Sequence, residues 1–508
     1  MSARERVPTE IWLEIFGHLP RSSLKQTSLT QREFKIPSRT LLFDHFRLQP
    51  YASHYARSGA VPHTPAVVQR NLERLDFWSS AEIAPLVREY SIAVEQITDL
   101  PAKTDTSPFV VLAAFFDRFE RLTGLKKLSA QGVHFSQTGV IGLCRSSVLV
   151  DLEVKHCYIM PGERIDTTGL QLRLSRFRYS HPWSGTRPNP ADVEKPDLWI
   201  PLLHPEHLRV LHVWVDPQLK VMSETMALGP TFPHVHKLIT SVDPGTLARN
   251  RLAWDKFPGV RTLDLMAWGY RIPPLGEAHP VLSPDVMPLL EEYIGLPHAL
   301  HIFAARATLR RVHIDHCSLE QLISSLEWVQ SPQVTSFSID TLDVLDVSSL
   351  SVIFDSFPML ETMSILVLNN DDDDDGGEGG CPDSTVCTRR TKPSAVPTTN
   401  NSSGCKIFLP SRRINHTSDE PAVPNPGMGI RVPLRRPAGI HRRLAEIPAM
   451  RKKLRERCPA LRKLWLEGIH FVSTWRLHDE DEDEEGEEKT TLGTIGSKGN
   501  GHEDFWDH

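Results

Sequence analysis

The side chains that could perform chemistry are dispersed along the chain. His234 and His236 could begin a metal site, but no third ligand follows nearby, so a pair of surface histidines is favoured. Five consecutive aspartates, 371–375, lack the alternating ligands, the turning glycine and the closing glutamate of a calcium loop. The sequence contains no phosphate-binding glycine loop and no HExxH or GxSxG motif. We therefore expect a non-catalytic protein without metal or cofactor.

A basic stretch and the overall charge bear on nucleic-acid binding. The chain has 57 basic and 63 acidic residues, a net charge of −6, which makes nucleic acid an improbable partner for the whole chain. The stretch 431–457 is locally basic and could serve nuclear import or an acidic partner. The favoured interpretation is the solvated face of a helix with Leu444, Ile447 and Leu454 turned inward. Neutralisation by the chain's own acidic runs is a third possibility.

Cysteine usage and hydropathy indicate the compartment. The seven cysteines form no CxxC motif, and no Cys/His cluster has zinc-finger spacing, so free thiols are expected. The first residues have no apolar segment of signal-peptide length, and no run of 18 apolar residues could span a membrane. The sequence predicts an intracellular protein of the cytoplasm, the nucleus or both.

A short apolar pattern recurs through most of the chain. The pattern apolar-x-x-apolar-x-apolar is common by chance, but from Leu128 to Met363 the steps between copies are 24, 25, 34, 27, 25, 49, 25 and 26 residues. Two copies, 149–159 and 309–319, share a longer form in which Cys157 and Cys317 occupy the same position. Leucine-rich repeats have about 20–29 residues. The sequence thus resembles a degenerate array of such repeats, with each unit supplying one strand of a shared parallel sheet. An ordinary α/β domain with evenly spaced strands is the alternative.

The pattern also predicts which strand residues point away from the core. Side chains alternate along a strand, so Trp214, Ile239 and Met266 should lie on the open face of three neighbouring strands. His313 and Asp315 should share that face further along the array. Aromatic and methionine side chains are enriched at binding hot spots. We therefore expect Trp214, Ile239 and Met266 to form an apolar centre that binds an unknown target protein. An error of one residue in register would instead turn them inward.

The N-terminal residues 7–25, VPTEIWLEIFGHLPRSSLK, carry more apolar side chains than a short segment can bury by itself. Ile11, Ile15 and Leu19 recur at helical spacing, Pro8 suits a first helical turn, and Pro20 stops the helix. An amphipathic helix packed on its own protein is one explanation. A surface for a second protein is the other.

This N-terminal pattern resembles the F-box, the adaptor-binding motif of SCF-type (Skp–cullin–F-box) ubiquitin ligases. The resemblance covers residues 7–34 and includes Val-Pro-x-Glu-Ile, Leu-Glu-Ile-Phe, His-Leu-Pro, Ser-Leu-Lys and Ser-Leu-Thr. It departs from the family near Gln31, where many members have a cysteine. The resemblance implies three helices, a Skp-type adaptor as partner and, through it, a cullin. The implied adaptor-binding residues are Pro8, Ile11, Ile15, Leu19, Pro20, Leu24 and Leu29.

The resulting prediction is an α/β protein with five segments. They are an F-box (1–45), an irregular leucine-rich-repeat-like solenoid with a parallel sheet (46–368), a disordered acidic and polar insertion (369–425), a C-terminal repeat with the basic helix (426–477) and a disordered acidic tail (478–508). The function expected from this organisation is substrate recognition in an SCF-type ligase. A repeat scaffold that acts outside any ligase is the alternative.

Overall fold

The computed structural model describes most of the chain before residue 368 and three short segments after it. The described residues are 8–54, 57–97, 107–160, 163–181, 199–215, 227–241, 251–266, 281–329, 331–342, 350–367, 459–468, 471–476 and 490–491. Among these residues, no helix combines the length and the apolar character that crossing a membrane requires.

Three short helices open the chain. They are α1 (Thr9–Gly17), α2 (Arg21–Thr30) and α3 (Arg32–Leu42), and α3 contains the buried Pro37. Pro8 and Pro20 are the residues directly before α1 and α2, where the fixed φ angle of proline suits a helix start and its missing N–H costs no hydrogen bond. The predicted N-terminal group of three helices is therefore present.

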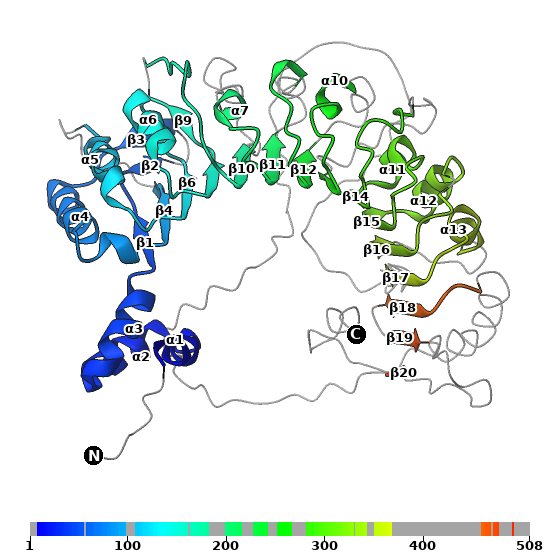
Figure 1. Ribbon diagram of the computed structural model, residues 1–508, viewed down its shortest axis with the longest axis horizontal. Coiled ribbons are helices and arrows are strands. Elements are labelled where there is room, and N and C mark those ends of the chain that lie inside the picture. The colour runs from blue at the N-terminus through cyan, green and yellow to red at the C-terminus, as the bar shows by residue number, and fades with distance from the viewer. Residues whose placement is uncertain are drawn as a thin grey trace, which may run out of the picture. The chain divides into compact units, whose positions relative to one another are not determined.

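A fifteen-stranded sheet dominates the rest of the described chain (Figure 1). Its strands follow one another in chain order, and neighbours are parallel from β1 through β18, so the predicted α/β class with a large parallel sheet is confirmed. β18, β19 and β20 pair antiparallel. The strands are β1 (His45–Leu48), β4 (Glu89–Ala93), β6 (Lys127–Gln131), β8 (Asp151–Lys155), β10 (Arg176–His181), β11 (Val210–Val215), β12 (Lys237–Ser241), β13 (Thr262–Met266), β14 (Glu292–Gly295), β15 (Arg311–Cys317), β16 (Ser336–Leu342), β17 (Thr362–Val367), β18 (Lys463–Gly468), β19 (Phe471–Arg476) and β20 (Thr490–Thr491).

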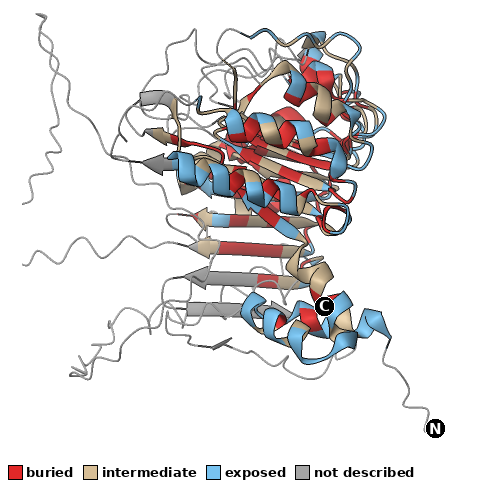
Figure 2. Cartoon of the chain, turned by 90° about the vertical axis from the view of Figure 1, so that its left-hand side faces the viewer, coloured by how far each residue is buried: buried red, intermediate tan, exposed pale blue. Residues whose placement is uncertain are grey.

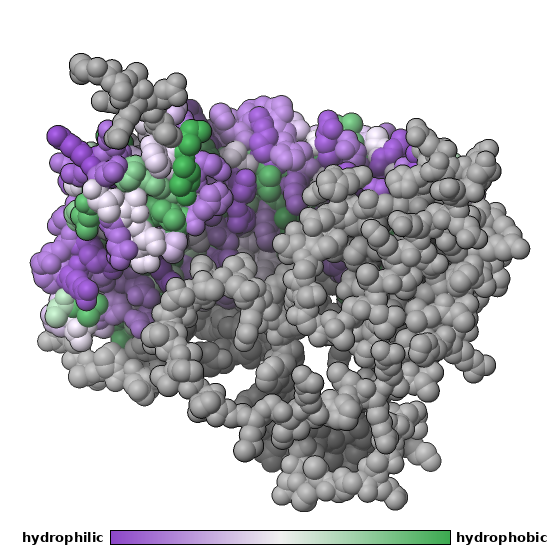
Figure 3. Space-filling view, turned by 90° about the horizontal axis from the view of Figure 1, so that it is seen from below, coloured by the Kyte–Doolittle hydropathy of each residue, from purple (hydrophilic) through white to green (hydrophobic). Residues whose placement is uncertain are grey.

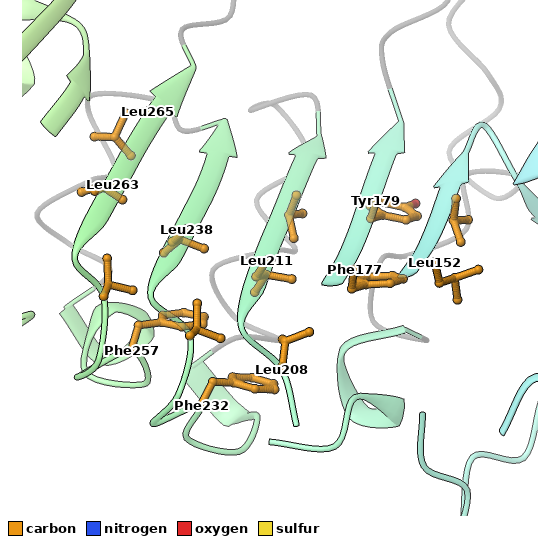
Figure 4. Close-up of a cluster of buried hydrophobic side chains, with 14 of the residues drawn as sticks. Leu152, Phe177, Tyr179, Leu208, Leu211, Phe232, Leu238, Phe257, Leu263 and Leu265 are labelled. Carbon is orange, nitrogen blue, oxygen red and sulfur yellow. The ribbon is translucent and has the colours of Figure 1, made fainter. Parts of the chain in front are cut away.

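The recurring sequence pattern corresponds to three buried rows across this sheet. Leu208, Leu211 and Val213 are one copy, and all three are buried. The middle position pairs in register from strand to strand, for example Phe177 with Leu211 and Leu211 with Leu238. Figure 4 shows these side chains stacked in rows between neighbouring strands. Because each unit buries its apolar side against the next, the units share one continuous core.

One strand of the array, β14, was not predicted. The step of 49 residues between Leu263 and Val312 contains Tyr293, which pairs with both of them. Its copy of the pattern ends in Gly295 instead of an apolar residue. Gly295 has φ +144°, and a Cβ atom there would lie 2.6 Å from the carbonyl oxygen of Leu265. Only glycine fits that position, so the pattern is interrupted where two strands approach closely.

Helices cover one face of the sheet (Figure 1). Their aromatic side chains meet the middle row of the core: the ring of Trp78 stacks on Phe46 at 4.5 Å, and Phe357 lies 5.3 Å from Phe337. Figure 2 shows the buried residues concentrated on the strands and on the helix sides that face them. The helical segments are α4 (Pro65–Trp78), η1 (Ala84–Leu86), α5 (Val110–Arg118), η2 (Phe119–Arg121), α6 (Gln137–Arg145), α7 (Trp199–Leu202), α10 (Arg251–Trp254), α11 (Pro297–Phe303), α12 (Leu319–Leu326) and α13 (Leu350–Ser356).

Two small sheets lie at strand ends. One contains β2 (Ala52–His54), β3 (Arg57–Val61) and β5 (Glu95–Ile97), and the other contains β7 (His134–Phe135) and β9 (Tyr158–Ile159). Cys157 precedes β9, and its buried thiol donates to the carbonyl oxygens of Ala130 and Lys155, both at 3.3 Å. Cys317 is also fully buried at the end of β15. The two cysteines therefore occupy the end-of-strand position that the longer repeat pattern predicts.

The chain divides into two compact units. One contains residues 1–369 and 448–508, and the other contains residues 370–447. β17 and β18 pair directly although β17 ends at Val367 and β18 begins only at Lys463. The predicted disordered insertion (369–425) and the predicted basic helix (431–457) lie outside the described residues. Of the predicted disordered tail, the structure describes only Thr490–Thr491, which form β20.

Candidate binding surfaces

An aromatic cluster joins α1 to α3. The ring of Phe34 on α3 lies 4.7 Å from Trp12 and 5.4 Å from Phe16 on α1, in both cases edge to face. Phe16 is only 3% exposed. Edge-to-face pairs of this kind contribute about 0.5–1.5 kcal/mol each beyond the area that they bury. Trp12 and Phe16 therefore belong to the core of the helices.

The neighbouring side of α1 leaves large apolar side chains in solvent. Ile11 is 49% exposed and Ile15 is 45% exposed, and they lie one helical turn apart. On α2, Leu29 is 86% exposed. Leu19 is half-buried, and Pro8 and Pro20 are exposed. Seen from below, green hydrophobic side chains gather among hydrophilic ones on the side where α1–α3 lie (Figure 3).

Leu24 was predicted to contact the adaptor, and its position argues against that role. Its side chain is 6% exposed because it lies on the side of α2 that faces the other helices. The helical repeat of apolar residues could not distinguish this inward side chain from the outward ones. We therefore remove Leu24 from the adaptor-binding set and assign it to the core of the three helices.

Polar contacts connect the helices to the chain that follows. The Arg21 guanidinium donates to the carbonyl oxygens of Leu42, at 2.8 Å, and His45, at 3.3 Å. Arg39 on α3 forms an ion pair with Glu82 at 3.3 Å. These groups are largely exposed, so each contact contributes little to stability. These contacts do not involve Ile11 or Ile15, so they leave those two side chains accessible.

A second candidate surface is the face of the sheet opposite the helices. Between β8 and β10 this face carries a network of charges: Asp151 pairs with Arg176 and Arg178 at 3.3 and 3.1 Å, and Glu153 pairs with Lys155 at 2.8 Å. Burial raises the pKa of Asp151 although both arginines oppose that shift. For Glu153, burial would also raise the pKa, but the contact with Lys155 and its neighbours lowers it. The pKa of Glu153 is therefore lower than usual, and its carboxylate is ionised at neutral pH.

The predicted apolar centre lies on the next three strands. Trp214 on β11, Ile239 on β12 and Met266 on β13 occupy outward positions and are half-buried, as the register predicted. Met266 pairs with Ser241, whereas Ile239 pairs with Asp264, so Ile239 lies two residues earlier along the strands than Met266. Among them, His212 pairs with Ile239. Burial and the nearby Arg178 lower the pKa of His212 to about 4, so this imidazole is neutral at physiological pH.

The open face is acidic within the apolar centre as well as beyond it. Asp264 on β13 pairs in register with Ile239, and burial and the neighbouring Asp315 raise the pKa of Asp264 to about 6. Glu292 on β14 pairs with Arg311 on β15 at 3.2 Å. The three large apolar side chains are therefore interspersed with and flanked by polar and charged groups, a mixture that is common at protein-binding surfaces.

One cluster on this face was only half anticipated. His313 and Asp315 were predicted to point outward, and the structure brings Asp340 from the neighbouring strand beside them, with possible ligand atoms of all three within 4.8 Å of one another. Asp340 was missed although the repeat register makes the strand of Phe337 the neighbour of the strand of Val312, because only the outward positions of the earlier strand were considered. His234 instead pairs with Glu206 at 3.0 Å, in exposed positions.

No family model matches the sequence, and no curated protein is significantly similar to it.

Proposed function

We propose that this chain is the substrate-recognition subunit of an SCF-type ubiquitin ligase. In this proposal the helices α1–α3 are an F-box that binds a Skp-type adaptor and, through it, a cullin. The strands and helices that follow form a degenerate leucine-rich-repeat array that binds a target protein. The chain carries out no bond chemistry itself. It raises the local concentration of the target beside the ubiquitin-loaded enzyme.

The observation that supports this proposal most strongly is the exposed apolar side of α1. Ile11 and Ile15 remain about half exposed while Phe16, on the same helix, is buried. Completing the burial of Ile11, Ile15 and Leu29 against a partner would contribute roughly 1–2 kcal/mol for each side chain. The resemblance of residues 7–34 to the F-box identifies that partner as a Skp-type adaptor.

The open face of the sheet supports the second half of the proposal. Trp214, Ile239 and Met266 provide large apolar side chains on three adjacent strands. The charged residues on either side would favour one orientation of a partner and would disfavour others. The target itself is identified only as a protein with a complementary surface.

A repeat scaffold that works outside any ligase is the second candidate. Its support is the open face of the sheet, where Trp214, Ile239 and Met266 lie on three adjacent strands. Such a scaffold would use the same open face and would have no use for Ile11 and Ile15. The two proposals therefore differ in whether the exposed side chains of Ile11 and Ile15 are needed to bind a partner.

The replacement Ile15→Asp tests the proposal. Ile15 is exposed, so the change should alter the free energy of unfolding by about 0.5 kcal/mol or less. A charge in the centre of the interface should abolish binding to purified Skp-type adaptor, measured by co-purification. Leu228→Asp is the matched control, because Leu228 is 90% exposed at a site far from α1 in the sequence. Adaptor recovery with Ile15→Asp equal to that with the control would reject the ligase proposal.

A further inference from the structure

The cluster of His313, Asp315 and Asp340 lies on β15 and β16, at outward positions of both strands. His313 and Asp315 are two residues apart on β15, so their side chains share one face of the sheet. On β16, Ile339 pairs with Ile314 and Thr341 pairs with His316. Asp340 therefore stands directly opposite Asp315 in the neighbouring strand.

Two carboxylates in this relation repel each other. Like charges that are directly opposite on paired strands are destabilising, and a cation between them offsets the repulsion. The two aspartates lie between paired residues of β15 and β16, Ile314 with Ile339 on one side and His316 with Thr341 on the other, although the pairing of β16 with β17 is irregular between Ile339 and Leu342. The sheet therefore holds two anionic oxygen ligands in place before any cation binds.

The ring of His313 is oriented toward the same point. Its Nδ1 atom forms a hydrogen bond with the Ser338 hydroxyl. That contact turns Nε2 toward the carboxylates, at 3.2 Å from Asp340 and 3.9 Å from Asp315. Histidines that bind metals are held in this way, with one ring nitrogen fixed by a hydrogen bond and the other facing the metal.

We propose that His313, Asp315 and Asp340 bind a divalent transition-metal ion of the zinc type. Ligand atoms around a tetrahedral zinc ion lie about 3.4 Å apart, close to the separations of Nε2 from the two carboxylate oxygens. An imidazole ligand favours zinc over calcium or magnesium, which prefer oxygen ligands alone. Water completes the coordination on the solvent side. This inference does not depend on the proposed ligase function.

A thermal-shift titration of the full chain with zinc chloride tests the site. A metal that binds the folded sheet and not the unfolded chain raises the melting temperature. We expect zinc to raise the melting temperature of the wild type by several degrees, and Asp340→Asn to lose most of that increase. Asp340 is about half exposed, so the variant should fold, which its melting temperature without zinc establishes. The matched control is Glu206→Gln, which removes the carboxylate of the His234–Glu206 pair and should keep the full zinc effect.

The replacement Asp315→His separates zinc coordination from simple attraction of cations. Histidine is itself a zinc ligand, so this variant should keep the zinc-dependent shift and should show visible absorption bands when cobalt(II) replaces zinc. An equal zinc effect in wild type and Asp340→Asn would overturn the proposal, as would no effect in the wild type. Loss of the effect in Asp315→His, or a calcium effect as large as that of zinc, would also overturn it. In those cases His313 serves as the charged partner of the two aspartates.

Discussion

At the residue scale, the open face of the sheet places ionisable side chains where burial changes their affinity for protons. His212 is an example, because it lies on β11 beside Arg178 and Lys237, whose positive charges oppose its protonation. Its Nε2 atom is buried and has no hydrogen-bond partner among the described residues. A neutral imidazole in this position costs less than a charged one.

This environment predicts how stability depends on pH. The pKa of His212 is about 4 in the folded protein and close to 6.5 in an unfolded chain. As the pH falls from 6.5 toward 4, the unfolded state binds a proton that the folded state does not, so the wild type loses stability. His212→Gln removes this contribution. The melting temperature of the variant should therefore fall less than that of the wild type between pH 7 and pH 4.5, and equal decreases would contradict the assigned environment.

The residue scale also shows where the sequence was ambiguous at the N-terminus. Ile11 and Ile15 on α1 and Leu24 on α2 were all predicted to contact the adaptor, yet the first two are about half exposed and the third is buried. A repeat of apolar residues marks the sides of a helix that avoid water, and it does not distinguish burial within the chain from burial against another protein. Contacts between helices decide that question, and α3, which contributes Phe34, lies at the end of the resembling stretch.

At the element scale, a buried arginine joins α11 to the loop before β14. Arg306 is 1% exposed, and its guanidinium donates to the carbonyl oxygens of Val286, at 3.1 Å, Ile302, at 2.9 Å, and Ser283, at 3.4 Å. It also lies 5.0 Å from the ring centre of Phe303. Burial lowers its pKa to about 10, so it stays charged at neutral pH.

Arg306→Met should destabilise the protein by about 2–4 kcal/mol, because methionine fills much of the space but leaves buried carbonyl groups without donors. The urea midpoint of unfolding measures this loss. Arg310→Met is the matched control, since Arg310 makes one carbonyl contact in an exposed position and should cost about 0.5 kcal/mol or less. Equal midpoints for the two variants would show that Arg306 does not join these elements.

The elements of the sheet were largely predictable, and the exceptions have physical causes. The nine copies of the apolar pattern from Leu128 to Met363 lie in strands of the sheet because their apolar side chains must be buried in the shared core. β14 was missed because Gly295 replaces the last apolar residue where a side chain would clash with β13. The order of the strands follows from the repeats, but the meeting of His313 with Asp340 depends on the directions of their side chains. The pattern of apolar residues does not encode those directions.

At the scale of the whole molecule, the chain joins a continuous sheet to a separate unit, 370–447. In the sequence this unit lies between β17 and β18. In the sheet the two strands pair directly, with Thr362 paired to Lys463. The first unit therefore does not need residues 370–447 to complete its strand order. The unit can serve a purpose of its own, or act as a long connection.

Deletion of residues 370–447 should leave the sheet folded. The connection between β17 and β18 becomes about fivefold shorter, which lowers the entropy cost of closing it and stabilises the fold by roughly 1.5 kcal/mol. The urea midpoint of the deletion variant should equal or exceed that of the full chain, with circular dichroism as a check on folding. A markedly lower midpoint would show that the unit supports the sheet.

The most direct test of the central claim is hydrogen–deuterium exchange on the full chain with and without purified Skp-type adaptor. The proposal predicts slower exchange in α1 and α2 when the adaptor is present, because their exposed apolar side becomes buried, and unchanged exchange in the strands β10 to β17. Unchanged exchange throughout α1 and α2 at saturating adaptor, or slower exchange confined to the sheet, would contradict the claim that these helices form the adaptor-binding surface.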